Sequence, residues 1–330
     1  MNPTVVRNTL VAALAVAAWQ AAPHAAAQSW PSKPIRVIVP YPPGGPMDPL
    51  MRLLQEPLGA ALGQSVVVEN RPGATGSVGM NVVAHSAPDG YNLTVATNDG
   101  ILIIPRLKKD LPYDIEKDFE PVTQMVYTTT LLVTQPSSPF NDFRELVAYA
   151  KANPGKLNMG SFGLGGGVHQ LLELINSRAG VKIVHVPYKG SGPAVQAALA
   201  GEVDLAASTP QVVGPMVRAG KLKALAITGD RRNADFPDVR LYKEQGYDIP
   251  PGGWFGLFAP GKTPADITNR LSAEVSKILK SPAQRKLITA AFGTEPVGNT
   301  PEEFARFLKS EGPRADELAN LLRAAGYQGD

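Results

Sequence analysis

The sequence predicts an α/β protein of two lobes, each a mostly parallel sheet flanked by helices. Three observations support this prediction. Short β-branched runs alternate with helical segments, which is typical of parallel βαβ units. The 330 residues correspond to about two domains at roughly 150 residues each. The strands and helices fall into two successive blocks, and a helix-rich tail is long enough to return to the first block.

Composition excludes several classes of protein. Apolar residues make up 44% of the chain and charged residues 18%, which is typical of a folded protein rather than a disordered one. The chain has no cysteine, so a disulfide scaffold and a cysteine-ligated metal are excluded. The formal net charge is only +3, so we expect no nucleic-acid partner.

The first 27 residues are typical of a secretory signal peptide. Arg7 gives a basic start, residues 10–19 form an apolar run, and residues 25–27 provide a small-residue cleavage site. A membrane span needs about 20 apolar residues, so this run is too short for an anchor. We expect cleavage after Ala27 and a soluble protein in the periplasm.

The first block begins with a β-branched run and continues through two βα units. We expect Asp48 to cap a helix that has Pro49 in its first position. The predicted strands cover residues 35–39, 65–69 and 93–97, and the predicted helices cover 49–62 and 78–84.

The second block and the tail follow the same periodicities. Thr300 and Glu303 fit a capping box at the start of the last predicted helix. The predicted strands cover residues 130–134, 157–161, 182–186, 205–207 and 222–228. The predicted helices cover residues 142–152, 169–179, 194–200, 211–219, 263–279, 282–291 and 301–325.

Extended apolar stretches near residues 126–134 and 253–260 connect the blocks. We therefore expect lobe 1 to comprise residues 28–126 and 254–330, and lobe 2 to comprise residues 127–253. Ligands of open parallel sheets bind beyond the carboxyl ends of the strands, so the loops after the strands are expected to line a cleft.

Four loops between a strand and a helix are rich in glycine or polar residues, at 41–48, 70–77, 161–169 and 187–191. Glycine lets the backbone approach a ligand, and free N–H groups at a helix start favour an anion such as a carboxylate. The loops contain no cluster of charged residues, so neutral N–H groups are the expected ligand contacts. A tight turn that binds nothing explains the first loop equally well.

The other three loops differ in the contacts and ligands that they favour. Arg71 in the second loop is more readily explained by an ion pair within its lobe than by a ligand contact. The third loop has neither the dinucleotide fingerprint nor a phosphate-binding lysine, so a nucleotide is not expected. Ser161 with the N–H groups of residues 165–167 predicts a second neutral anion site. In the fourth loop Tyr188 can close over a ligand and Lys189 can attract anions.

Catalytic patterns are missing from the sequence. Ser161 and Ser191 lack the Gly-x-Ser-x-Gly pattern, because Met159 and Lys189 occupy the first glycine positions. No histidine pair has the spacing of a zinc site. His169 at the start of an apolar helix is more typical of a cap or core residue than of a base. We expect a binding protein with no catalytic residue, no metal and no cofactor; an exported hydrolase is the less favoured alternative.

The sequence resembles the substrate-binding proteins of tripartite tricarboxylate transporters, also called Bordetella uptake gene (Bug) receptors. The resemblance covers residue 30 to the C-terminus. It is carried by WPSKPIR at 30–36, PYPPGG at 40–45, ENRPGA at 69–74, APDGY at 87–91, LPYD at 111–114, HVPYKG at 185–190 and PVGNTPEEF at 296–304. It implies a monomeric periplasmic binding protein of the type II-like Venus-flytrap kind.

Such a receptor closes on a small organic anion, here a di- or tricarboxylate or an aromatic acid, and delivers it to membrane permease subunits. The resemblance implies ligand contacts from both lobes. They are Tyr41, Gly44, Gly45, Met47, Thr97 and Asn98 in lobe 1, and Thr128, Ser161, His169, Tyr188, Lys189 and Ser208 in lobe 2.

Two of these residues depart from the family pattern. Met47 stands where threonine is usual, and Ser208 stands where aspartate is frequent. Without that aspartate the pocket lacks a partner for an ammonium group, and methionine makes it more apolar. The departures predict a carboxylate without an amine rather than an amino acid. A receptor that presents its ligand to a signalling histidine kinase is the alternative with the same fold.

Overall fold

The computed structural model describes residues 30–292 and 296–327, so the predicted signal peptide lies outside the described residues. All the elements below belong to the compact unit formed by Lys33–Asp330. Within the described ranges, no helix is long and apolar enough to cross a membrane.

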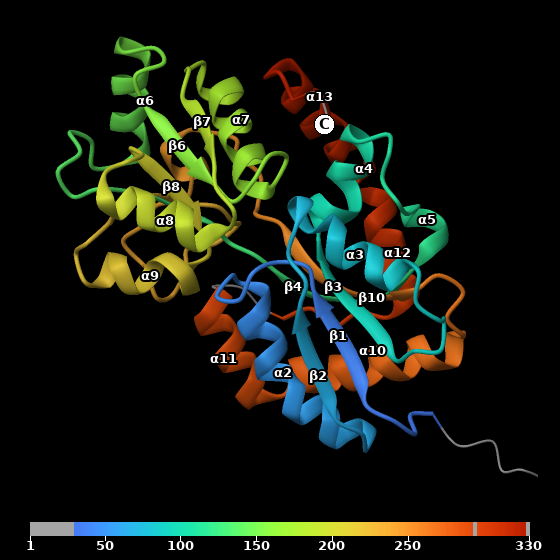
Figure 1. Cartoon of the computed structure of the whole chain (residues 1–330). Helices are drawn as coiled ribbons and strands as arrows, with labels where there is room; N and C mark the ends of the chain where they lie inside the picture. Colours follow the sequence, from blue (N-terminus) through green and yellow to red (C-terminus); the bar gives the residue numbers. More distant parts are fainter. Residues whose placement is uncertain (1–29, 293–295, 328–330) are drawn as a thin grey trace, which may run out of the picture. The chain divides into compact units, whose positions relative to one another are not determined.

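The first five-stranded sheet has the order β2-β1-β3-β10-β4 (Figure 1). β2, β1 and β3 pair in parallel, β10 is antiparallel to β3, and β4 is antiparallel to β10. Four of the five strands therefore run in one direction. The bounds are β1 Ile35–Val39, β2 Val66–Asn70, β3 Asn92–Thr97, β4 Phe119–Tyr127 and β10 Trp254–Pro260.

The second sheet repeats this plan with the order β7-β6-β8-β5-β9. β7, β6 and β8 pair in parallel, β5 is antiparallel to β8, and β9 is antiparallel to β5. The bounds are β5 Leu131–Thr134, β6 Asn158–Ser161, β7 Val184–Pro187, β8 Leu205–Ser208 and β9 Lys223–Ile227. Two mixed, mostly parallel sheets confirm the predicted fold class.

Helices flank both sheets. Those near the first sheet include α2 Met47–Leu62, α3 Ser77–Ala84, α5 Ile115–Asp118, α10 Ala265–Lys280 and α12 Pro301–Ser310, with the short turns η1 Ala74–Gly76, η2 Asp99–Ile103 and α4 Ile104–Leu107. Those of the second block are α6 Phe143–Ala152, α7 Gly167–Ala179, α8 Ser191–Ala200, α9 Pro210–Arg218 and η3 Lys243–Gln245. The tail also contains α11 Pro282–Phe292 and α13 Gly312–Ala324.

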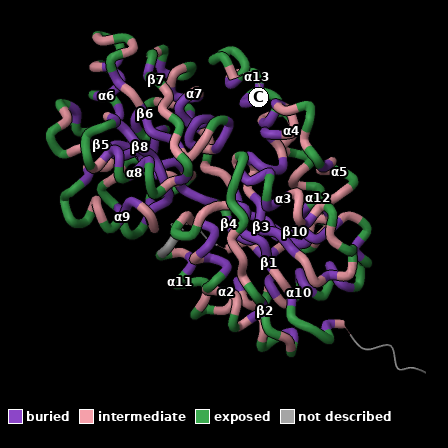
Figure 2. The backbone as a smooth tube through the Cα atoms, viewed as in Figure 1, coloured by how far each residue is buried: buried purple, intermediate pink, exposed green. Residues whose placement is uncertain are grey.

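Buried residues concentrate along the strands and the helix faces that cover them (Figure 2). In the first sheet, the Trp254 ring packs edge-on against Phe304 at 5.5 Å between centroids, and Phe258 lies 5.2 Å from Phe304. All three side chains are almost fully buried. These aromatic contacts hold α12 against the strand β10.

The chain passes between the sheets along two adjacent stretches. The Thr128 N–H donates to the Gly253 carbonyl at 2.7 Å, and the Thr228 N–H donates to the Thr130 carbonyl at 3.0 Å. A Cβ on Gly252 would lie 1.9 Å from the Thr128 carbonyl oxygen, so only glycine fits there. The lobe boundaries themselves stay predictions.

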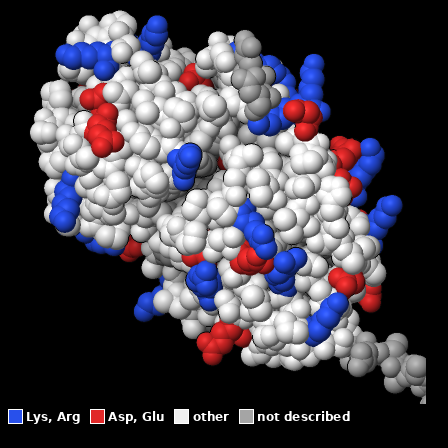
Figure 3. Space-filling view, in the orientation of Figure 1, with Lys and Arg blue, Asp and Glu red and all other residues white. Residues whose placement is uncertain are grey.

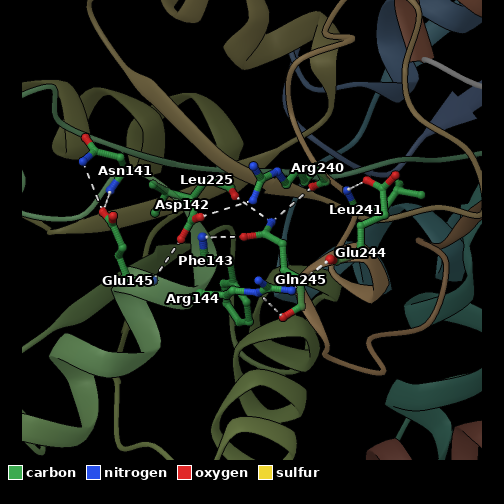
Figure 4. Close-up of polar contacts among 10 residues, drawn as sticks. All are labelled: Asn141, Asp142, Phe143, Arg144, Glu145, Leu225, Arg240, Leu241, Glu244 and Gln245. Atoms are coloured by element: carbon green, nitrogen blue, oxygen red, sulfur yellow. Dashed lines mark hydrogen bonds and ion pairs between the residues drawn. The ribbon is translucent and has the colours of Figure 1, made fainter.

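A buried glutamine connects three segments of the second block (Figure 4). The Gln245 Oε1 accepts a hydrogen bond from the Phe143 N–H at 2.8 Å, at the start of α6. Its Nε2 donates to the Leu225 carbonyl of β9 at 3.0 Å and to the Arg240 carbonyl at 3.4 Å. Arg240 also lies 3.7 Å from Asp142, the N-cap of α6. A buried amide with all these partners fixes the segment against the sheet.

Two predicted features of helix ends can be compared directly with the structure. The capping box of Thr300 and Glu303 is confirmed. Asp48 as a helix cap is wrong, because α2 begins at Met47 and Pro46 is its N-cap residue. Asp48 instead lies in the first turn, where its carboxylate is 3.0 Å from Arg52. That position still favours a carboxylate, since the helix dipole is positive there.

The last predicted helix is two helices rather than one. α12 ends at Ser310 and α13 begins at Gly312, with Pro313 in its first turn. Proline has no N–H for the preceding turn, so a continuous helix through this position is disfavoured. α13 packs against both α7 and the η2–α4 segment. Leu318 and Leu322 on α13 are buried in the same apolar cluster as residues of α7.

Candidate functional site

A cavity of about 230 Å³ lies where the loops after the strands of both sheets meet. Pockets for drug-sized ligands usually measure about 300–1,000 Å³, so this volume suits a smaller molecule. The lining comes from the loops after β1, β3, β6, β7 and β8, from both crossing stretches, and from α7 and α13. Figure 3 shows a face on which charged side chains are scattered among large uncharged areas.

Most of the residues predicted as ligand contacts meet in this cavity. Those that line it are Tyr41, Gly44, Gly45, Met47, Thr97, Asn98, Thr128 and Ser208. Ser161, His169, Tyr188 and Lys189 are outside the lining. Contact with a ligand stays a prediction for all of them.

The loop between β1 and α2 forms one wall. Gly44 has φ +81°, a conformation that favours glycine, and Gly45 leaves the backbone accessible. Met47, the first residue of α2, is 2% exposed and buries its side chain in the wall. The start of a 16-residue helix therefore faces the cavity through a glycine-rich approach, an arrangement that favours an anion.

Tyr41 connects this loop with others around the cavity. Its hydroxyl lies 3.4 Å from the Thr97 Oγ1, and its ring meets Phe162 edge-on at 6.4 Å between centroids. Burial, followed by the nearby Asp99 carboxylate, raises the pKa of Tyr41 well above its usual value. The side chain is therefore a neutral hydroxyl at physiological pH.

Asp99 is a lining residue that the sequence analysis missed. It follows β3 in the π-helical turn η2 and is 3% exposed. Burial raises its pKa, and hydrogen bonds from the Thr97 side chain and from backbone N–H groups, including that of Gly167, oppose this shift. An acidic residue two positions beyond a predicted strand was the signal available in the sequence.

Hydroxyl groups from the crossing stretches and from β8 form another part of the lining. The Thr228 Oγ1 accepts a hydrogen bond from the Thr130 N–H at 2.9 Å, which joins the two stretches. Thr209 precedes α9 as its N-cap residue, but its hydroxyl makes no cap hydrogen bond. Thr209 was also missed, although it directly follows the predicted Ser208.

The opposite wall is mostly apolar and includes the C-terminal helix. α13 contributes Leu318 and Arg314, and neither was predicted. Further apolar residues of the lining include Phe162, Val168, Leu171, Leu174, Ile249 and Phe255. A ligand in this cavity therefore meets polar groups at the loops and aliphatic or aromatic side chains elsewhere.

The lining contains three charged residues, of which only Asp48 belongs to one of the four predicted loops. Asp48, Asp99 and Arg314 all lie in it. Arg314 donates to the Pro251 carbonyl at 2.8 Å and lies 3.5 Å from Glu311, so its charge is partly satisfied within the protein. The sequence did not point to Arg314 because it belongs to a helix far along the chain, not to a loop after a strand.

Ser161 and His169 belong to a buried cluster outside the cavity. The His185 Nε2 lies 2.6 Å from the Ser161 Oγ, and the His169 and His185 rings stack at 3.7 Å with 7° between their planes. The His169 Nδ1 accepts from the Gly165 N–H at 3.0 Å. Burial lowers the pKa of His169 to about 3, with a further contribution from His185, and burial lowers the pKa of His185 to about 4. Both rings are neutral at pH 7 and fix the glycine loop that precedes α7.

The remaining predicted residues have other surroundings. The Tyr188 N–H donates to the Ser161 carbonyl at 2.8 Å, and Lys189 is exposed. Gly190 and its successors, rather than Lys189, reach the cavity. Arg71 forms the predicted kind of ion pair within its own lobe, with Glu69. Within the described ranges, no group of three or more acidic or histidine side chains could hold a metal ion.

Comparison with known proteins agrees with this geometry. The family model described as "Tripartite tricarboxylate transporter family receptor" matches residues 50–323 of this chain. The protein BugT of Bordetella pertussis is 36% identical over 302 residues, which cover 91% of each chain.

Two solved structures have similar folds and contain carboxylates. A Rhodopseudomonas palustris protein with adipate has a TM-score of 0.84 at 31% identity, over 89% of this chain and 98% of the other. The protein MatC from the same organism, with bound malate, has a TM-score of 0.80 at 31% identity, over 88% of this chain and 100% of the other. With the matched segment covering most of the sequence, the chain belongs to the tripartite tricarboxylate transporter receptor family, whose members are solute-binding proteins and not enzymes.

Proposed function

We propose that this chain is a periplasmic receptor that captures a small organic carboxylate and delivers it to the permease subunits of a tripartite tricarboxylate transporter. The observation that carries the proposal is the cavity itself. It combines a glycine-rich loop and the start of α2 with groups from the second sheet. Relatives solved with adipate and with malate support a carboxylate as the ligand.

Capture proceeds by closure of the two lobes on the ligand. The loops of the two sheets already touch, because the Thr75 Oγ1 donates to the Leu164 carbonyl at 3.3 Å and Tyr41 packs against Phe162. A ligand held by both sets of loops binds the closed arrangement more tightly than the open one. Binding therefore stabilises the closed arrangement. Because backbone N–H groups hold the acid, release needs no exchange of a buried salt-bridge partner.

The lining favours an acid with an apolar body and no amine. Met47 and the leucines of α7 and α13 supply aliphatic surface, and Ser208 supplies a hydroxyl in place of a carboxylate. An ammonium group placed beside Ser208 would lose its hydration without gaining a charged partner from that residue. Of the two acidic residues in the lining, Asp48 is already paired with Arg52, and burial raises the pKa of Asp99, which favours its uncharged form. Longer aliphatic or aromatic acids are therefore favoured over amino acids.

Isothermal titration calorimetry with mono- and dicarboxylates tests the proposal. We expect binding of at least one aliphatic or aromatic acid and weaker binding of aspartate and glutamate. Gly45→Val should abolish binding, because its side chain would occupy the backbone approach to the ligand; its Cβ meets only the Pro42 carbonyl at 3.5 Å, so folding is expected. Gly312→Val is the matched control, since a Cβ there lies 3.8 Å from a flexible arginine outside the cavity.

Indifference of the wild-type protein to every acid would contradict the proposal. Equal loss of binding in Gly45→Val and Gly312→Val would show that the effect of the first variant is not local. Uptake into vesicles that carry the permease pair of a tripartite tricarboxylate transporter tests delivery. Accumulation of the bound acid only when the protein is added is the expected result, and accumulation without it refutes the partnership.

A further inference from the structure

The cavity continues from the loops along one face of helix α7. Gly167, Leu171 and Leu174 line it at spacings of three and four residues, which place them on the same side of the helix. Gly167 lies at the polar end, because a Cβ there would be 4.0 Å from the Asp99 Oδ1. The step from Gly167 to Leu174 spans about 10 Å, at roughly 1.5 Å per residue. The cavity is therefore elongated, with a second end near Leu174.

Aliphatic side chains from three separate segments enclose this second end. Helix α13 packs against α7, and Leu318 of α13 belongs to the same apolar cluster as Leu171 and Leu174. Ile249, which precedes the crossing stretch at Gly252, belongs to that cluster as well. All four apolar residues also line the cavity. The second end is thus a part of the apolar core that the cavity opens.

The leucines of the lining remain accessible, although they are mostly buried. Leu171, Leu174 and Leu318 are 6%, 5% and 4% exposed. Leu172 and Leu322, on the same two helices but outside the lining, are 0% exposed. A ligand in the cavity can therefore contact the first three leucines, whereas the other two face only protein.

The polar side chains that α7 and α13 bring to the lining already have partners within the protein. Gln170 donates from its Nε2 to the Gly165 carbonyl at 2.8 Å. Arg314, the only basic residue of the lining in the described part of the chain, donates to the Pro251 carbonyl at 2.8 Å and lies 3.5 Å from Glu311. A second carboxylate of a ligand would lose its water here without meeting a free cation.

We propose that the ligand is a monocarboxylate with an elongated apolar body, which lies along α7 and α13 against Leu171, Leu174 and Leu318. This inference rests on the proposed function, since the acid group must lie at the glycine-rich loop of the same cavity. The three leucines are then specificity-determining residues that set the length of the accepted chain. Each methylene that leaves water adds a similar favourable contribution until the chain meets the far wall.

Calorimetry with unbranched monocarboxylates from acetate to decanoate tests the wild-type protein. We expect affinity to rise by about fourfold for each added methylene, and then to fall once the chain is longer than the cavity. Dicarboxylates with a carboxylate at each end and the same number of carbons form the second series. They should bind about tenfold more weakly than the monocarboxylate of equal length, because their second charge enters the apolar end.

Leu318→Ala should move the best chain length upward by about one or two carbons, because it enlarges the far end. Its affinity for propionate, which is too short to reach that end, should stay within about twofold of the wild type. Leu322→Ala is the matched control: Leu322 lies one turn later on α13, in the same cluster but outside the lining. It removes the same methylenes from the core and should keep the wild-type length profile.

Circular dichroism establishes that both variants are folded. If either alanine variant fails to fold, Leu318→Val and Leu322→Val repeat the comparison with a smaller loss of packing. The valine pair should differ in the same direction, by a smaller change in the affinity for the longest acids.

Three results would overturn the inference. They are an affinity that does not increase with chain length, dicarboxylates that bind more tightly than monocarboxylates of equal length, and equal length profiles in the Leu318 and Leu322 variants. In each case the wild-type protein still binds an acid, so the proposed function stands. Failure of the wild-type protein to bind any acid refutes the function itself.

Discussion

The stacked pair His169 and His185 predicts a steep loss of stability in mild acid. Both rings are neutral in the folded protein, because burial lowers the pKa of His169 to about 3 and of His185 to about 4. In the unfolded chain each ring has a pKa of about 6.5. As the pH falls below 6.5, the unfolded state binds two protons that the folded state does not bind. Stability is therefore fully present above pH 6.5 and is lost as the pH falls.

The size of the effect follows from these values. At pH 5, protonation stabilises each unfolded histidine by about 2 kcal/mol relative to pH 7.5, while the folded rings remain almost neutral. The pair should therefore lower the free energy of unfolding by about 4 kcal/mol over this interval. Asp99 and Glu173, whose pKa values burial raises, contribute in the opposite direction, so the effect must be isolated by variants.

Urea denaturation at pH 7.5 and pH 5 of the wild type and of the double variant His169→Asn/His185→Gln provides the test. Asn can accept the hydrogen bond from Gly165, and Gln can keep the contact with Ser161. The variant should lose about 4 kcal/mol less than the wild type between the two pH values. Exposed His85 supplies the control His85→Asn, which should follow the wild type. Equal pH dependence in the wild type and the double variant would refute the reasoning.

Three further predictions concern stability, each measured as the free energy of unfolding in urea. Phe304→Ala should cost about 3–5 kcal/mol, because it leaves a cavity beside Trp254; a cost below 1 kcal/mol would contradict the packing. Thr300→Ala should cost about 1 kcal/mol by removing the capping box of α12, and no change would mean that the cap contributes nothing. Gly252→Ala should cost about 1–3 kcal/mol, since its Cβ would overlap the Thr128 carbonyl; a stability equal to the wild type would show that the crossing stretches adapt freely.

The regular periodicities predicted most of the fold. The strands before glycine-rich loops, such as Ile35–Val39, combine β-branched residues with clear turn signals at their ends. β4 was not predicted as a strand. Its segment Phe119–Tyr127 contains Pro121, Thr123 and Gln124 within an interrupted apolar pattern, and it is held by pairing with the distant β10. Such pairing depends on residues more than 100 positions away, which local patterns do not report.

The candidate site likewise combines residues that local sequence patterns predict with residues that only tertiary packing places there. Loops after strands were predictable, because parallel strands bring their carboxyl ends to one edge, and Tyr41, Thr97 and Ser208 meet there. Sequence reasoning could not place Arg314, since the packing of α13 depends on tertiary contacts. Ser161 is conversely well placed at a strand end, but its hydroxyl is engaged by His185 rather than directed to the cavity.

The position of α13 has a consequence for substitutions that lie outside the loops. Leu318 and Arg314 belong to the wall of the cavity, and the helix that carries them packs against α7 and against the η2–α4 segment. A substitution that loosens this packing would therefore reshape the cavity without altering any residue of the loops that follow the strands.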